Sequence, residues 1–115
     1  MKLINAYINP NKRDQLKEKL NETEHHGLTI TEVAGYGNQK GDITQYRGAP
    51  YTPKFLSKIK VEIMALDRDV EMITDIILVV CQSKPHGELG DGKIAILPLE
   101  DVIRIRTGER GEIAI

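Results

Sequence analysis

Residues 58–65 read KIKVEIMA, a segment in which apolar and polar side chains alternate without a break. Successive side chains of a β-strand point to opposite faces of the sheet. One face of this strand would therefore be apolar throughout, and the other would carry Lys58, Lys60, Glu62 and Met64. The pattern predicts a strand with one face in a core. Its other face is mixed, and we expect another copy of the chain to cover it rather than water.

The N-terminal half adds two strands and a helix. Residues 2–8 and 28–33 have the apolar character of strands. Between them, Asn9-Pro10 indicates the start of a helix, because Asn is a good cap and Pro fits the first helical position. We expect this helix over about residues 10–24. Its clearest apolar anchors are Leu16 and Leu20.

The C-terminal half predicts a second helix and further strands. The helix would follow a cap at Asp67 or Asp69, although residues 76–80 alone could also form a strand. Its apolar residues at helical spacing are Val70, Ile73, Ile77 and Val80. Residues 93–97 predict a short strand stopped by Pro98, and residues 101–106 are strand-like. The order β-α-β-β-α-β is that of a ferredoxin-like α+β fold, an antiparallel sheet with two helices on one face.

Composition narrows the classes of function. The 115 residues are expected to form one domain, 1–115, whose modest core favours association with other copies. A formal net charge of −1 and 4% aromatic residues argue against a nucleic-acid partner. No apolar run reaches the roughly 18 residues of a membrane span, and no signal peptide is visible, so we expect a cytoplasmic protein without membrane insertion. Cys81, the single cysteine, is expected to be a small buried hydrophobe.

The strongest functional signal is a glycine turn that is followed directly by a lysine. It reads Gly90-Asp91-Gly92-Lys93, and its glycines let backbone N–H groups approach a ligand. Arg104 and Arg106 would present two guanidiniums on one face of a strand. Amides, a lysine and an arginine pair together predict a site for the phosphates of a nucleotide. The alternative interpretation of the arginines is that they are edge-strand charges that prevent aggregation.

A segment of roughly twenty residues with little apolar content follows the 28–33 strand. A loop this long in a compact domain is usually functional or disordered, and we expect it to protrude. Its glycines 35, 37 and 41 do not have the spacing of a dinucleotide-binding fingerprint. The His25-His26 pair has no third ligand nearby, so no intrinsic metal site is expected.

Five segments in this order resemble the PII signal-transduction proteins, and the resemblance covers nearly the whole chain. They are residues 29–33, 35–41, 46–51, 90–93 and 104–109. The resemblance implies a homotrimer of ferredoxin-like subunits that binds ATP or ADP in the clefts between subunits. It also implies a T-loop at about 37–55 that inserts into partner proteins, a B-loop at about 82–92 that wraps the phosphates, and a C-terminal segment at 101–115.

The same resemblance assigns individual residues. The adenine pocket would be formed by Tyr7, Thr29, Glu62 and Met64. The phosphate site would be formed by Gly37, Gln39, Gly90, Asp91, Gly92 and Lys93, with Arg104 and Arg106 from the neighbouring subunit. Gln39 would help to hold Mg-ATP, and Lys58 would pair with 2-oxoglutarate. In the T-loop, Tyr46 and Arg47 would contact partners, and Tyr51 is a candidate for covalent modification.

Three departures from the family pattern bear on this assignment. Residues 82–89 form a longer B-loop that carries Pro85 and His86. Asn38 replaces a common T-loop arginine, and Pro50 stands where an acidic residue is usual, just before Tyr51. The departures point to a divergent member in which the nucleotide site is kept.

Three hypotheses of function follow. The leading one is a non-enzymatic regulator of a transporter, such as the ammonium channel, or of a metabolic enzyme, either with a 2-oxoglutarate response or as an adenylate-only energy sensor. Such a regulator would lie at the membrane only through its transporter. The second is a slow ATPase, for which no general base is obvious. The third is a structural trimer without nucleotide, like the divalent-cation tolerance proteins.

Overall fold

Four strands and two helices make up the part of the chain that the structure describes. The computed structural model covers residues 1–24, 27–37 and 54–115. The strands are β1 (Lys2–Ile8), β2 (Thr29–Gly37), β3 (Lys54–Ala65) and β4 (Gly92–Pro98). The helices are α1 (Arg13–Asn21) and α2 (Val70–Cys81), with short 3-10 turns at Pro10–Lys12, Asp67–Asp69 and Gly111–Ala114. The predicted β-α-β-β-α-β order is therefore confirmed.

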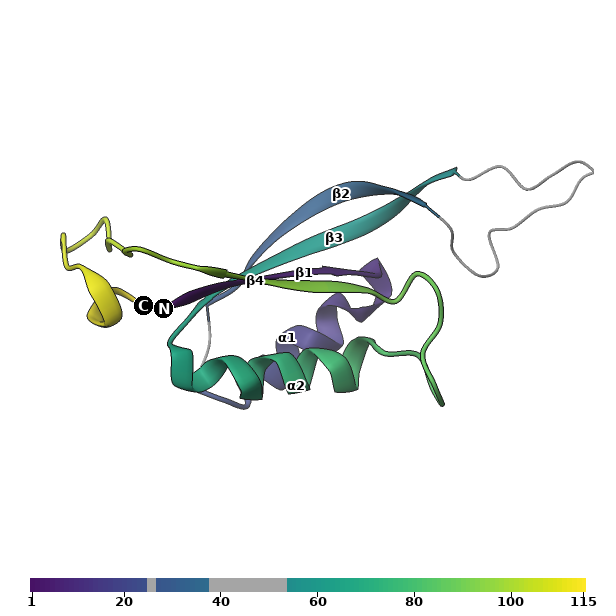
Figure 1. The fold of residues 1–115 in the computed structure, drawn as a ribbon, viewed down its shortest axis with the longest axis horizontal. Coiled ribbons are helices and arrows are strands. Elements are labelled where there is room, and N and C mark those ends of the chain that lie inside the picture. The colour runs from purple at the N-terminus through teal and green to yellow at the C-terminus, as the bar shows by residue number, and fades with distance from the viewer. Residues whose placement is uncertain (25–26, 38–53) are drawn as a thin grey trace, which may run out of the picture.

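The strands form one antiparallel sheet in the order β2-β3-β1-β4. Both helices lie against the same face of the sheet, as Figure 1 shows. The opposite face carries no helix from the described part of the chain. This arrangement is the ferredoxin-like α+β fold that the sequence predicts.

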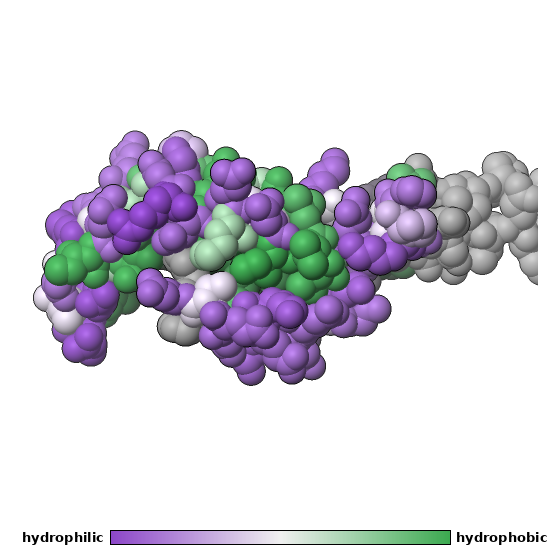
Figure 2. All heavy atoms as spheres, turned by 90° about the horizontal axis from the view of Figure 1, so that it is seen from below, coloured by the Kyte–Doolittle hydropathy of each residue, from purple (hydrophilic) through white to green (hydrophobic). Residues whose placement is uncertain are grey.

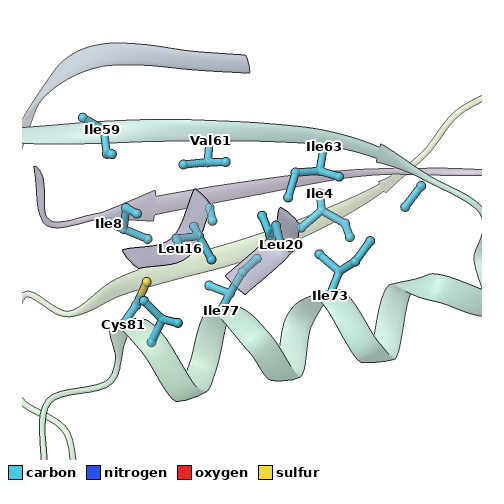
Figure 3. Close-up of a cluster of buried hydrophobic side chains, with 13 residues drawn as sticks. Ile4, Ile8, Leu16, Leu20, Ile59, Val61, Ile63, Ile73, Ile77 and Cys81 are labelled. Carbon is cyan, nitrogen blue, oxygen red and sulfur yellow. The ribbon is translucent and has the colours of Figure 1, made fainter. Parts of the chain in front are cut away.

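The core lies between the sheet and the helices. On the sheet side, the β1–β3 register pairs Ile4 with Ile63 and Ile8 with Ile59. On the helix side, the buried apolar residues are Leu16, Leu20, Ile73, Ile77 and Val80. Figure 3 labels all of these side chains except Val80 and shows them pointing toward one another from β1, β3, α1 and α2. Because each predicted apolar face is buried, the alternation in β3 and the helical spacing in α2 are confirmed.

The β2–β3 hairpin is longer than the sequence predicts. β2 continues past residue 33 to Gly37, and β3 begins at Lys54 rather than at residue 58. Tyr36 and Phe55 pair across this extension, with ring centroids 4.9 Å apart. The extension projects beyond the helices (Figure 1), so both rings stay exposed. The sequence of this extension does not alternate between apolar and polar residues, because neither of its faces covers the core.

Two other predicted elements differ from the structure. The helix predicted over 10–24 begins as the 3-10 turn Pro10–Lys12 and ends at Asn21. Residues 101–106 do not form a strand: one isolated bridge joins Ile103 to Arg110, and a turn follows. The prediction is wrong there because β4 ends at Pro98 and the chain then pairs with itself.

Candidate functional site

The loop between α2 and β4, here called loop 82–92, is closed at its neck by one carboxylate. Asp91 accepts hydrogen bonds from the backbone N–H of Ser83 (2.9 Å), the Ser83 hydroxyl (2.6 Å) and the backbone N–H of Glu88 (2.9 Å). The Gly87 N–H donates to the Ser83 carbonyl at 2.6 Å. These bonds give the loop a defined shape within a single chain.

Asp91 is ionised in this setting. Partial burial alone would raise the pKa of Asp91, but the hydrogen bonds from Ser83 and Glu88 and the nearby Lys12 ammonium outweigh it, so the pKa lies below its usual value. Both carboxylate oxygens face donors of the loop itself. The resemblance places Asp91 among the nucleotide ligands. In the structure, its carboxylate accepts the hydrogen bonds that hold the loop together.

Gly92 lies where loop 82–92 enters β4. A Cβ atom on Gly92 would come within 1.7 Å of the Tyr7 carbonyl oxygen, and the residue has a φ of 113°. Only glycine fits this close approach of β4 to β1 and adopts this backbone conformation readily. Gly90, with a φ of 94°, is also in the left-handed region. As a result, Lys93 is positioned directly across from Tyr7 on the neighbouring strand.

Lys58 ties this loop to the sheet. Its ammonium donates to the Gly90 carbonyl oxygen at 2.6 Å and to the side-chain oxygen of Asn9 at 2.5 Å. Asn9 occupies the predicted cap position of Pro10–Lys12, but its side chain makes no cap hydrogen bond there. Lys58 therefore lies at the base of the loop, beside the glycines of the predicted phosphate site. Its pairing with 2-oxoglutarate stays a prediction.

The sheet face opposite the helices collects the predicted base-binding residues. The register sets Thr29 opposite Glu62 and Tyr7 opposite Lys93. Alternation along the strands puts Lys93 on the same face as Glu62, two residues along from the row that contains Thr29. A hollow of about 740 Å³ is bordered by Thr29, Glu62 and Met64. Tyr7 lies outside this hollow but on the same face. Gly37, at the far end of β2, is distant along the strand from all of them.

A second hollow of about 410 Å³ lies beneath loop 82–92, on the helix side. Its apolar lining comes from Ile77 and Leu78 of α2 and Ile94 of β4. Charged residues of the loop, including Glu88 and Asp91, also border it. Cys81 lines this hollow too; it is buried, as predicted, and burial raises the pKa of its thiol to about 11.

Arg104 and Arg106 do not share a strand face, contrary to the prediction. Both lie in or beside a turn, where the Arg104 guanidinium bonds Glu109 (3.1 Å) and the Ile113 carbonyl oxygen (2.8 Å). This turn follows the C-terminal end of β4, whereas Lys93 is at its start. β4 has seven residues, so the two ends are about 20 Å apart. The arginine pair and Lys93 of one chain therefore cannot hold the same phosphate group.

Several predicted site residues lie outside the described residues. They are Gln39 of the phosphate site, the T-loop residues Tyr46, Arg47 and Tyr51, the substituted positions Asn38 and Pro50, and the His25-His26 pair. Most of the predicted T-loop, residues 38–53, also lies there. Their assignments stay predictions.

Sequence reasoning missed two residues that shape the site. Ser83 supplies two of the three hydrogen bonds to Asp91, and Asn9 helps to position Lys58. A serine and an aspartate that bracket a glycine-rich loop are a recognisable turn signal, since both side chains bond nearby backbone groups. The sequence holds no such signal for Asn9, because the residue that it contacts, Lys58, is 49 positions away.

The geometry defines a class of protein. It is a ferredoxin-like α+β subunit with an ordered glycine loop, a lysine at the start of an edge strand, and one sheet face left without a helix in the described part.

The comparisons agree with this class. The family model described as nitrogen regulatory protein P-II matches residues 1–109. Nitrogen regulatory protein P-II of Nostoc punctiforme and that of Azospirillum brasilense are each 47% identical to this chain, and that of Synechocystis is 44% identical. In each case the match covers the full length of both chains. The chain belongs to the nitrogen regulatory protein P-II family of signal-transduction proteins.

Two features are absent from the described ranges 1–24, 27–37 and 54–115. No helix there has both the length and the apolar character needed to cross a membrane. No group of three or more His, Cys, Asp or Glu residues there is arranged to hold a metal ion.

Proposed function

We propose that this chain is a non-enzymatic cytoplasmic regulator that binds ATP or ADP between three copies of itself. It would control a transporter or a metabolic enzyme through residues 37–55. The observation that carries the proposal is the position of Lys93. It lies on the same sheet face as Tyr7, Thr29 and Glu62. A base on that face and phosphates at the loop would lie within one extended site.

The opposite ends of β4 support a site between copies. Loop 82–92 offers glycine amides and one lysine, which is a small positive charge for a triphosphate. Arg104 and Arg106 can add to it only from another chain, because their own loop is about 20 Å away. A nucleotide bound at such a junction would stabilise the oligomer by mass action.

The test is calorimetric titration of ATP and ADP, each with and without Mg²⁺ and 2-oxoglutarate. We expect both nucleotides to bind, and GTP to bind more weakly as the matched control. Lys93→Ala should weaken the binding of both, while Lys17→Ala on the exposed side of α1 should not. If neither adenine nucleotide binds the folded oligomer, the proposal is wrong and a structural trimer becomes the better interpretation.

Lys58 favours a second candidate, an adenylate-only energy sensor. Its ammonium already bonds Gly90 and Asn9, so an added carboxylic acid would compete with these contacts. Titration of 2-oxoglutarate into the Mg-ATP complex separates the two candidates. If the acid binds only with Mg-ATP, and Lys58→Met removes this effect but keeps ATP binding, the sensor has two inputs. If the acid has no effect on the wild type, the adenylate-only candidate is correct.

Target control is a separate part of the proposal. Deleting residues 43–52 should abolish capture of the target and leave the oligomer and its nucleotide binding intact. Pull-down of the target with and without ATP measures the first, and light scattering measures the second. If the deletion variant still captures the target, the target binds another part of the molecule.

A further inference from the structure

The two helices cover the same face of the sheet, but their outer sides differ. Every exposed residue of α1 is polar or charged. In contrast, α2 leaves three large apolar side chains exposed, namely Met72 (39%), Leu78 (51%) and Val79 (66%). Figure 2 views the molecule from the helix side and shows hydrophobic side chains gathered in its middle, beside a hydrophilic band. The outer side of α2 therefore carries apolar surface that the core does not use.

Part of this surface forms a stripe along α2. Met72, Ile76 and Val79 are three or four positions apart and so share one side of the helix; together they are called the α2 stripe. Met72 and Val79 are exposed, and Ile76 is partly buried and packs against the core. None of the three lines the hollow beneath loop 82–92, which Leu78 borders. The α2 stripe is therefore separate from that loop.

The charges beside the α2 stripe are all acidic. Glu71 and Asp75 are the only charged residues of α2, and both are exposed. Neither forms an ion pair with any residue that the structure describes. On α1, by comparison, basic residues lie among the acids, namely Arg13, Lys17 and Lys19. An apolar stripe beside two carboxylates without ion pairs complements a partner that brings apolar and basic side chains together.

We infer that the α2 stripe docks a basic amphipathic helix of another protein. The apolar side of such a helix would cover the stripe, and its lysines or arginines would reach Glu71 and Asp75. A second copy docked through the same surface would bring the carboxylates of both copies together, which is unfavourable. An anionic membrane surface would be repelled by the same acids. This surface goes beyond the proposed function, because it uses neither loop 82–92 nor residues 37–55.

A synthetic amphipathic helix is the probe for this surface. It is a fluorescein-labelled peptide of leucine and lysine, patterned so that the leucines lie on one side of a helix. Its control has glutamate in place of every lysine. Fluorescence anisotropy with the full oligomer, at peptide concentrations where the peptides are monomeric, should show saturable binding of the Leu/Lys peptide, at least tenfold tighter than that of the Leu/Glu peptide. Absence of saturable binding would overturn the inference.

Val79→Gln tests the apolar part of the contact. Glutamine is a good helix former, so the variant removes apolar surface and keeps α2 intact. We expect the Leu/Lys peptide to bind at least fivefold more weakly, while ATP affinity and oligomer mass stay those of the wild type. Ile113→Gln is the matched control, because Ile113 is similarly exposed (64%) but lies outside α2, and it should leave peptide binding unchanged. Equal effects of the two variants, or no loss in Val79→Gln, would contradict the docking.

Charge reversal tests the acidic part. Glu71→Lys/Asp75→Lys is compared with Asp14→Lys/Glu18→Lys, since each pair consists of exposed acids four positions apart on a helix of the same layer. The α2 variant should bind the Leu/Lys peptide at least tenfold more weakly and gain affinity for the Leu/Glu peptide. The α1 variant should lose less than threefold. Equal losses in both variants would show that only the overall charge matters and would overturn the inference.

Two other occupants would give different results, and each would refute the proposed partner. If the oligomer mass rises with concentration in the wild type but not in Val79→Gln, the occupant is a second copy. If the wild type binds phosphatidylserine vesicles but not the Leu/Lys peptide, and Val79→Gln binds neither, the occupant is a membrane surface. Failure of the docking would leave nucleotide binding untouched, since ATP titration of the wild type measures that function separately.

Discussion

The two ends of β4 are stabilised in different ways. At its start, loop 82–92 is bonded to parts of the chain that are distant in sequence, through Lys58 and the fit of Gly92 against Tyr7. At its end, residues 99–115 bond mostly to one another. The two ion pairs there are Arg104–Glu109 (3.1 Å) and Arg110–Asp101 (2.9 Å).

Exposure differs between these ends as well. The C-terminal segment leaves large apolar side chains in water, namely Ile103, Ile105 and Ile113. Its shape comes mostly from bonds between its own residues. Loop 82–92 leaves one large apolar side chain exposed, that of Leu89, whereas the C-terminal segment leaves three that no described part of the chain covers. The comparison predicts large stability effects at the loop end and large binding effects at the other end.

Gly92→Ala should have the largest effect. The added methyl group collides with the Tyr7 carbonyl, and the residue must keep a φ of 113°. We expect a loss of at least about 3 kcal/mol in the free energy of unfolding, from backbone strain and overpacking together. Urea denaturation measures it, with Gly27→Ala as control because no atom lies within 4 Å of that added Cβ. A loss below about 1 kcal/mol would mean that β4 can move away from β1.

Arg104→Ala tests the other end. If the guanidinium contacts phosphate across the junction between copies, nucleotide binding should weaken by about 1.5–3 kcal/mol. The stability of the subunit should change by less than about 1 kcal/mol, since the Arg104–Glu109 pair is partly exposed. Calorimetry measures the nucleotide affinity, and thermal unfolding measures the stability of the subunit. Arg13→Ala is the control, because Arg13 is exposed. Unchanged nucleotide affinity would remove Arg104 from the site.

Asp91→Ala should remove about 2 kcal/mol of stability at neutral pH, because three donors at the loop neck lose a charged acceptor. The pKa of Asp91 is lowered in the folded chain, so this contribution is present above about pH 4 and is lost as the pH falls through the lowered pKa. The difference between wild type and variant, measured by urea denaturation, should therefore shrink below about pH 4. Asp75→Ala, on the exposed side of α2, is the control. A difference that grows on acidification would contradict the assignment.

Arg110→Ala should have the smallest effect. Its ion pair with Asp101 is largely exposed, and such pairs contribute little to stability. We expect denaturation curves that overlap with those of the wild type at moderate salt. A clear loss of stability would show that the C-terminal segment is coupled to the core, and the contrast between the two ends would be weaker than described.

The sequence predicts those parts of the fold that a core imposes. Residues 59–65 alternate because one of their faces is buried, and α2 has helical spacing for the same reason. The hairpin extension at Tyr36 and Phe55 has no buried face, so its strands end too early in the prediction. Residues 101–106 show the opposite error, because their alternation is that of a strand although the chain turns back at Gly108 (φ 73°).

The candidate site was predictable to the extent that it depends on glycine. The glycine spacing before Lys93 indicated a close backbone approach, and Gly92 makes one. Two supporting contacts could not be inferred from periodicity. Lys58 meets Asn9 across 49 positions, and Ser83 meets Asp91 across eight, each through a single pair of side chains.

The closed neck of loop 82–92 has an evolutionary consequence. Ser83 and Asp91 clasp the loop where it leaves the fold, and Gly92 fixes the point at which the chain returns to the sheet. Residues between Ser83 and Glu88 can then be gained or lost without a change of register in β4. Descendants of one ancestral subunit could adjust the reach of this loop by insertion alone, and thereby change which ligands they discriminate while the scaffold stays the same.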